Sequence, residues 1–335
     1  MKIIAGWRRS NQLARFDVFL LVAVLITGVP CSYGGCGDDN HPSQNLEIRT
    51  WYDLDAIRDN LDGNHTLMND LDSGTAGYEE LASPTANAGK GWQPIGYSTV
   101  EVSWGCSKYV ADYGLTGTFD GQGHEIRDLF INPDEFAAGL FTYLIDGGII
   151  KNVGVVNITV VGYNVVGSLV GSNHGGTVSN CYSNGNVTGR AAIGGLVGRN
   201  IGTISNSYCT GRVTGSFNVG GLVGQQHPGC SISNCYSSCT VILNLDPEGP
   251  VGGTGGLVGS NGGTVSSSFW DTETSGQSTS GGGIGKNTTE MKNITTFTDA
   301  SWNIMAVTLN QTNRAYIWNI IDGQTYPFLS WQSVS

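Results

Sequence analysis

The stretch GGLVGRNIGTISNSY, residues 194–208, decides the fold, because close copies of it recur along the chain. GGLVGQQHPGCSISNCY occupies residues 220–236 and GGLVGSNGGTVSSSF occupies residues 255–269. Counted from the residue before each LVG or LF, five units begin in steps of 29, 27, 26 and 35 residues, at Gly139, Ser168, Gly195, Gly221 and Gly256. A nearly constant period of this length is typical of a repeat architecture.

The composition of each unit favours β-strands. Val, Ile, Thr and Tyr alternate with Ser and Asn, and glycine interrupts the pattern every five to eight residues. Such short runs are typical of strands and leave no interval long enough for a helix. Three short strands in about 26 residues fit one coil of a solenoid whose coils lie ~4.8 Å apart. The sequence therefore predicts an all-β fold, a right-handed parallel β-helix.

Stacked coils place equivalent residues in columns. Aligning the units on their TVSN-like runs predicts an aliphatic column and an aromatic column. The aliphatic column contains Val178, Ile204, Ile232 and Val265, and the aromatic column contains Tyr182, Tyr208, Tyr236 and Phe269. In this arrangement glycine serves the corners of the coil. A phosphate loop is the alternative, but SGGGIGKN at 280–287 lacks the first Gly and the last Ser or Thr of that motif.

Both ends of the coil stack carry sequences that predict short capping helices. Thr50 with Asp53 has the spacing of a capping box, and Asn287 with Glu290 repeats that spacing near the other end. An aromatic tail follows the second pair, with Trp302, Tyr316, Trp318, Tyr326, Phe328 and Trp331. We expect this tail to act as a lid, because aromatic side chains most often enter cores. The alternative is a platform on which sugars stack.

The first residues are typical of an export signal. Four basic residues precede the apolar run at residues 18–29, which is too short to span a bilayer as a helix. We therefore expect residues 1–34 to direct secretion or surface localisation, with no membrane-spanning domain in the mature chain. Cys31 offers an alternative, a lipid anchor.

Together these repeats resemble the GLUG repeat of bacterial and archaeal surface proteins. The phrases GWQPIG (91–96), GTFDGQGHEIRDLFI (117–131) and YIWNIIDGQTYPFLSW (316–331) fit the same family. Such repeats occur beside IgA-type metallopeptidases and in filamentous-haemagglutinin-like adhesins, so the resemblance implies a β-helix and surface display, and no particular reaction.

The expected organisation runs through five segments. It comprises an export signal at 1–34, a linker at 35–49, an N-terminal cap with the first coils at 50–135, GLUG coils at 136–285 and a C-terminal cap at 286–335.

Charge limits the possible functions. The 335 residues carry a net charge of -11, which argues against nucleic acid as a partner. Residues 147–245 contain no Asp or Glu. The central coils therefore cannot supply the paired carboxylates of a glycoside hydrolase or a calcium cluster. We expect no catalytic, cofactor-binding or metal-ligating residues, and an unidentified protein or glycan as partner.

Two alternatives to a non-enzymatic adhesive or display role remain. One is a polysaccharide lyase or hydrolase that uses acids within residues 112–135, with Asp120 in DGQGHE as the leading residue and Asp112 and Asp128 nearby. The sequence HEIRD at 124–128 lacks the second His of a metallopeptidase HExxH motif. The other alternative is a structural spacer or docking module.

Eight cysteines occur without a CxxC pair, so neither zinc nor a redox motif is indicated. Cys181 and Cys235 share a column but lie two coils apart, too far for a disulfide. Within one coil, Cys230 could reach Cys235 or Cys239, and the sequence leaves the pairing open.

Overall fold

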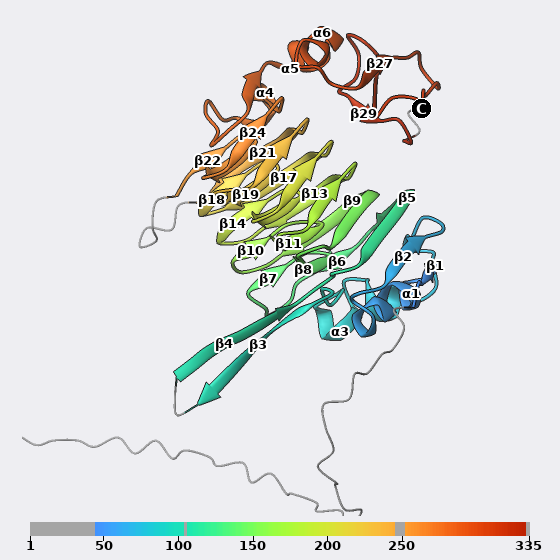
Figure 1. The fold of residues 1–335 in the computed structure, drawn as a ribbon, viewed down its shortest axis with the longest axis vertical. Coiled ribbons are helices and arrows are strands. Elements are labelled where there is room, and N and C mark those ends of the chain that lie inside the picture. Colours follow the sequence, from blue (N-terminus) through green and yellow to red (C-terminus); the bar gives the residue numbers. More distant parts are fainter. Residues whose placement is uncertain (1–43, 104–105, 245–251, 333–335) are drawn as a thin grey trace, which may run out of the picture. The chain divides into compact units, whose positions relative to one another are not determined.

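The structure is a computed structural model that describes residues 44–103, 106–244 and 252–332 (Figure 1). The side chains of residues 98–112 are not described. The predicted export signal at 1–34, with Cys31, and most of the predicted linker lie outside the described residues.

Parallel strands stacked coil upon coil form the body of the molecule, as the sequence predicted (Figure 1). Two sides of each coil are separate five-stranded sheets. One contains β8 (Phe141–Ile145), β11 (Val170–His174), β15 (Val197–Asn200), β19 (Val223–Gln226) and β23 (Val258–Asn261). The other contains β7 (Ala137–Ala138), β10 (Val165–Val166), β14 (Ala191–Gly194), β18 (Phe217–Gly220) and β22 (Thr254–Gly255).

The remaining side of the coil belongs to the largest sheet, in which β9 (Ile149–Val161) joins two rows of strands. The short row contains β12 (Thr177–Ser179), β16 (Thr203–Ser205), β20 (Ser231–Ser233) and β24 (Thr264–Ser266). The long row contains β13 (Tyr182–Thr188), β17 (Tyr208–Gly215), β21 (Tyr236–Leu243), β25 (Phe269–Asp271) and β26 (Ile284–Lys286). Below β9 the sheet continues through β5 (Thr118–Arg127), β6 (Phe130–Ile131), β2 (Asn64–Leu67) and β1 (Glu47–Ile48).

Each complete coil therefore has four strands, one more than the sequence predicted. The extra division lies between the short and the long row, where one residue per coil adopts a left-handed backbone conformation. In successive coils this residue is Asn152, Asn180, Asn206, Asn234 and Ser267, with φ between 43° and 55°. Asn tolerates this region better than most residues, so the Asn column makes the corner without glycine.

The predicted columns are confirmed by the strand register. Val178, Ile204, Ile232 and Val265 face one another in successive coils. Tyr182, Tyr208, Tyr236 and Phe269 do the same. The aliphatic column lies in the solenoid core and is buried except at Val265, which is half-buried. The aromatic column lies on the opposite face of the sheet, outside that core, in a second apolar cluster.

At the N-terminal end, the predicted capping box is confirmed, because the Thr50 side chain accepts from the Asp53 N–H at 3.2 Å. The helical segment comprises α1 (Trp51–Asp55) and the 3-10 helix η1 (Ala56–Asp59). Leu54 and Ile57 are fully buried against the first coils. The cap continues through α2 (Tyr78–Leu81) and α3 (Ala86–Gly89), and the antiparallel hairpin of β3 (Tyr97–Ser103) and β4 (Cys106–Tyr113) follows.

The C-terminal part also begins as predicted, since Asn287 and Glu290 form a capping box at the start of α5 (Thr288–Met291). After α4 (Thr272–Ser275) and α5 come α6 (Ile294–Thr298), β27 (Ile304–Ala306), β28 (Trp318–Ile320) and β29 (Phe328–Leu329). We call residues 287–332 the lid. The lid packs along the aromatic column rather than only over the last coil, from Phe269 back to Tyr182.

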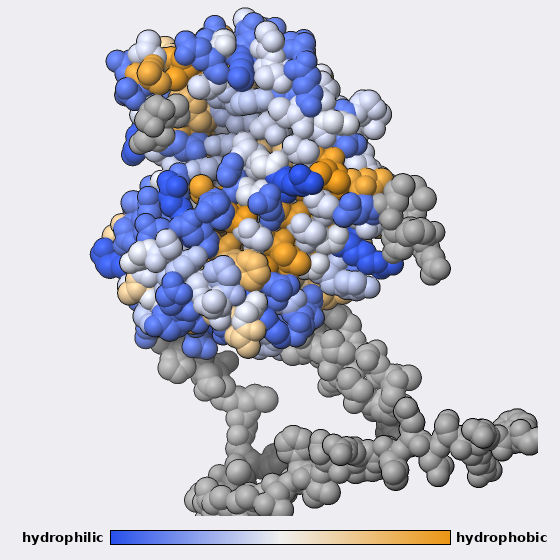
Figure 2. All heavy atoms as spheres, turned by 180° about the vertical axis from the view of Figure 1, so that it is seen from behind, coloured by the Kyte–Doolittle hydropathy of each residue, from blue (hydrophilic) through white to orange (hydrophobic). Residues whose placement is uncertain are grey.

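Burial contradicts the sugar platform that the aromatic tail offered as an alternative. Trp318 is 0 % exposed, and Trp302 and Phe328 are also buried. The Trp318 and Trp302 rings pack against the aromatic column, so a sugar could not stack on them without displacing the lid. The face turned away from the viewer in Figure 1 is mostly hydrophilic, with a few apolar residues near its middle (Figure 2).

Candidate functional site

The DGQGHE phrase lies on β5, between the N-terminal cap and the first full coil, because β5 pairs with both β2 and β9. Asp120 accepts hydrogen bonds from Asn152 Nδ2 and from the Gln122 N–H, both at 3.0 Å, and lies 3.2 Å from Lys151 Nζ. Burial alone would raise the pKa of Asp120, but these donors outweigh it and lower the pKa. Asp120 is therefore a carboxylate held by its neighbours at neutral pH.

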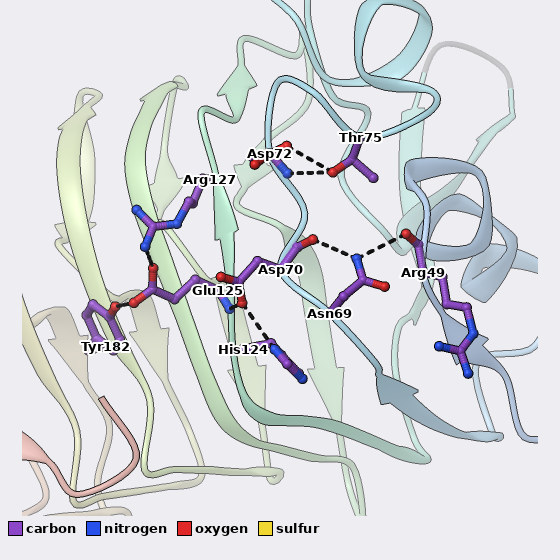
Figure 3. A network of polar contacts seen from close by, with 9 residues as sticks. All are labelled: Arg49, Asn69, Asp70, Asp72, Thr75, His124, Glu125, Arg127 and Tyr182. Atoms are coloured by element: carbon purple, nitrogen blue, oxygen red, sulfur yellow. Dashed lines mark hydrogen bonds and ion pairs between the residues drawn. The ribbon is translucent and has the colours of Figure 1, made fainter. Parts of the chain in front are cut away.

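The neighbouring His124 links the first coil to the cap. Its Nδ1 lies 3.1 Å from Asp70 Oδ1, and the same oxygen accepts the Glu125 N–H at 3.0 Å. Figure 3 shows Asp70 approaching β5 from the cap side. A histidine and a carboxylate in contact can serve acid–base chemistry, but here Asp70 also fixes the β5 main chain.

The side chain of Glu125 makes two further contacts. It accepts a hydrogen bond from the Tyr182 hydroxyl and forms an ion pair with Arg127 (Figure 3). Gly154 makes this contact possible, because it stands between Glu125 and Tyr182 in the register and a Cβ there would overlap the Tyr182 ring. Glu125 thus lies in line with the aromatic column, one strand beyond Gly154 and in contact with Tyr182, and sequence spacing alone did not identify that role.

Asp128, the other acid that the sequence placed near Asp120, accepts from Asn157 Nδ2 at 2.7 Å. The side chain of Asp112 lies outside the described residues. Asp120, Glu125 and Asp128 therefore hold strands together at the first coil. A glycoside hydrolase needs one carboxyl with a raised pKa beside an ionised one. The pKa of Asp120 is lowered, so this carboxyl does not fit the role of the acid.

A raised carboxyl pKa occurs elsewhere in the same segment. Burial raises the pKa of Glu135, and Arg58 opposes the rise. Glu135 lines a cavity of about 380 Å³, together with Asn87, Lys90, Gly91, Trp92, Gln93, Pro133 and Asp134. From the sequence, Glu135 was only one of the acids within residues 112–135. No motif marks it, and its distinguishing feature is its burial.

A regular polar surface lies on the outer face of β13, β17 and β21, and we call it the outer shelf. Its two rows are Asn184, Thr210 and Ser238, and Asn186, Arg212 and Thr240. Side chains alternate along a strand, so these residues point outward while Val187 and Val213 point into the core. Asn184 Nδ2 donates to Thr210 Oγ1 at 2.7 Å, which ties one coil to the next.

The structure contains no cluster of three or more potential metal ligands among the residues whose side chains it describes. Within the same part of the chain, no helix is long and apolar enough to cross a bilayer.

The family profile described as "The GLUG motif" matches residues 162–188, 189–214 and 215–242. The chain carries three GLUG motifs. Each GLUG motif is one coil with four strands; residues 162–188, for example, contain β10, β11, β12 and β13. Each motif also contributes one residue to each row of the outer shelf.

Halomucin from Haloquadratum walsbyi (strain DSM 16790 / HBSQ001) is 33% identical over 175 residues, which are 51% of this chain and 2% of halomucin. The chain thus matches a small part of that protein's length. A crystal structure of a candidate immunoglobulin A1 protease from Bacteroides ovatus superimposes with a TM-score of 0.51 at 19% identity. This alignment covers 87% of this chain and 94% of that chain, and at this identity the likeness concerns the fold alone.

Proposed function

We propose that this protein is an exported, non-catalytic β-helix that acts in surface display or adhesion, with the outer shelf as its contact surface for a protein or glycan. The observation that carries the proposal is the shelf itself, in which three successive GLUG motifs present amide, hydroxyl and guanidinium groups in register. The proposal includes residues 136–285 as the GLUG coils, between the N-terminal cap with the first coils at 50–135 and the C-terminal cap at 286–335.

The chemistry of the shelf suits a hydroxyl-rich or hydrogen-bonding partner. Parallel strands repeat their side chains every ~4.8 Å, so an extended glycan or peptide can meet equivalent donors and acceptors along its length. No carboxylate lies in residues 147–245, so the central coils do not repel an acidic partner. The acids near Asp120 and Glu125 are engaged within the protein, which supports a binding role over a catalytic one.

A binding comparison tests this proposal. The full chain is applied to a glycan array and to cells, beside a triple variant, Asn184→Ala with Thr210→Ala and Ser238→Ala. The control is Gln225→Ala with Ser260→Ala, two half-buried polar residues paired on β19 and β23. We expect the shelf variant to lose about tenfold in affinity, a loss of ~1.4 kcal/mol, and the control to bind normally. Equal binding by both variants would contradict the assignment of the shelf.

Glu135 favours a second function, a carbohydrate-active enzyme, because a half-buried carboxyl with a raised pKa beside a cavity is suited to act as a general acid. The assay is the release of reducing ends from polysaccharides. Release that is lost in Glu135→Gln and kept in Asp120→Ala would place catalysis at the cavity. Release that is lost in Asp120→Ala would instead place catalysis at DGQGHE. If the chain neither binds in the first assay nor releases reducing ends in the second, a structural spacer or docking module is the remaining function.

Localisation is part of the proposal and has its own test. We expect the chain to reach the cell surface or the medium through residues 1–34, and N-terminal sequencing of the exported protein would locate the cleavage. A lipid on Cys31 would appear instead as a modified N-terminal cysteine in the membrane fraction.

A further inference from the structure

The cysteines with described side chains have different surroundings. Cys181 Sγ lies 3.2 Å from the Ser179 carbonyl oxygen, and Cys235 Sγ lies 3.2 Å from the Ser233 carbonyl oxygen. These two thiols occupy the same column of the solenoid, with Ser207 between them. A repeated structural role in successive coils accounts for both.

Cys209 and Cys239 differ, because their sulfur atoms face each other. The two Sγ atoms are 2.7 Å apart and both side chains are buried. This separation is well inside the sum of two sulfur van der Waals radii. The sequence left open whether Cys230 pairs with Cys235 or Cys239, and in the structure Cys230 Sγ contacts the Pro228 carbonyl oxygen at 3.6 Å.

Strand register explains how the two sulfurs meet. Cys209 stands opposite Ser237, and Cys239 stands opposite Gly211, so the two cysteines are diagonal neighbours on the inner face of β17 and β21. Gly211 has a φ of 111°, and because it is a glycine no side chain stands opposite Cys239. Gly195 leaves the space that the Cys209 sulfur occupies, because a Cβ at that position would overlap this sulfur. The two sulfurs therefore meet where these glycines supply no side chains.

We propose that Cys209 and Cys239 form a disulfide that joins the coils of the second and third GLUG motifs. The oxidant is a small-molecule disulfide such as glutathione disulfide. The Cys209 thiolate attacks it, forms a mixed disulfide and releases one thiol. The Cys239 thiolate then attacks the Cys209 sulfur and expels the second thiol. Each cysteine gives up its proton to solvent, and the two electrons reduce the oxidant to two thiols.

The order of events follows from burial. Burial and the neighbouring Cys239 raise the pKa of the Cys209 thiol well above its usual range, so the thiolate is scarce in the folded protein. The exchange therefore takes place before β21 closes on β17. Once formed, the bond closes a 30-residue separation and restricts the unfolded chain. For a domain of this size the expected effect is an unfolding midpoint higher by about 5 °C.

Peptide mapping tests the bond directly. The reduced, denatured full chain is refolded with a mixture of reduced glutathione and glutathione disulfide, its remaining thiols are alkylated under denaturing conditions, and the digest is analysed by mass spectrometry. We expect one cross-linked peptide pair that contains Cys209 and Cys239, with Cys181 and Cys235 alkylated. Alkylated Cys209 and Cys239 in the unreduced protein, or a peptide that joins Cys230 to Cys239, would overturn the proposal.

Thermal unfolding with and without dithiothreitol provides an independent readout. Reduction should lower the midpoint of the unaltered chain and of the matched control Cys230→Ser by about 5 °C, and leave Cys209→Ser unchanged. An equal shift in Cys209→Ser would contradict the bond. If that variant does not fold, the peptide map of the unaltered chain decides alone.

Discussion

Gly154 occupies a position in the aromatic column where the three following coils carry Tyr182, Tyr208 and Tyr236. Without a side chain there, the Tyr182 ring can lie over Gly154 and its hydroxyl can reach Glu125. The next tyrosine, Tyr208, stacks on Tyr182 with ring centroids 5.0 Å apart. Because Gly154 has no side chain, the aromatic column makes contact with Glu125 in the first coil.

Gly154→Ala tests this role. The added methyl group would displace the Tyr182 ring and break its hydrogen bond to Glu125, so we expect the free energy of unfolding to fall by about 3 kcal/mol. Urea unfolding measures the change. The control is Gly74→Ala, at an exposed position with negative φ, which should change stability by less than about 0.5 kcal/mol. Equal effects of both substitutions would refute this role for Gly154.

Ser267 interrupts the column of left-handed asparagines and adopts a φ of 43°. Asn is more favourable than Ser in this region, and Asn234 stands one coil below. We expect Ser267→Asn to raise the free energy of unfolding by about 0.5 kcal/mol. The reciprocal change, Asn234→Ser, should lower it by a similar amount. A destabilised Ser267→Asn chain in urea unfolding would show that the corner at the last coil differs from the others.

At the scale of elements, the aromatic column holds the lid through its hydroxyl groups as well as its rings. Tyr208 OH contacts Gln332 Oε1 at 3.0 Å, and Tyr236 OH donates to the Pro327 carbonyl oxygen at 2.6 Å. From the lid, Tyr326 OH donates to Asp271 Oδ2 of β25 at 2.5 Å. The Tyr236 and Tyr326 contacts require neutral phenols because the hydroxyl group is the donor, so the lid couples stability to alkaline pH.

The pH dependence has a definite sign. Burial raises the pKa of Tyr182, Tyr208 and Tyr236 above their unfolded values. A raised pKa favours the protonated native state, so the stabilisation is complete below about pH 10 and is lost as pH rises further. Above about pH 10 the free energy of unfolding falls as pH rises. Each tyrosine contributes ~1.4 kcal/mol per pH unit to this slope, and the three together contribute about 4 kcal/mol per pH unit.

Urea unfolding between pH 8 and pH 11.5 measures this slope. Tyr208→Phe should reduce it by ~1.4 kcal/mol per pH unit, and the control Tyr52→Phe should leave it unchanged because Tyr52 is 50% exposed. An unaltered slope in Tyr208→Phe would show that the column does not control alkaline unfolding.

At the scale of the whole molecule, the coils are equivalent, so one coil can be deleted while the strand register is kept. The lid distinguishes them, because it contacts particular residues of particular coils. Residues 189–214 form one complete coil, and Gly189 and Gly215 occupy equivalent positions because Thr188 pairs with Thr214. The lid, in contrast, contacts the column at fixed places, so Gln332 loses its partner when Tyr208 is removed.

Deletion of residues 189–214 should therefore give a folded β-sheet protein with a lower unfolding midpoint, by roughly 5 to 10 °C. Circular dichroism and thermal unfolding measure both properties. Because the deletion removes Cys209, the reference is Cys209→Ser under reducing conditions. Deletion of residues 189–201, half a coil, is the control and should prevent folding, since it misaligns every later column. Similar behaviour of the two deletions would contradict a coil-by-coil architecture.

The sequence by itself determined the coil and its columns. Val178, Ile204 and Ile232 could be aligned without a structure because the register of a repeat is set by its period, and like residues stack on like. The capping boxes at Thr50 and Asn287 were equally predictable, because they depend on residues three positions apart. The left-handed corner that divides each coil into four strands was missed, since its Asn also suits an ordinary turn.

Only the tertiary structure decided which distant groups meet. Tyr208 and Gln332 are 124 residues apart, and Tyr182 and Glu125 are 57 apart, so no local pattern relates them. The Cys209 and Cys239 contact depends on the register of β17 with β21, and the raised pKa of Glu135 depends on its burial. Periodicity specifies neighbours that repeat, whereas contacts made once, by a lid or a cavity, follow from how the completed surfaces fit together.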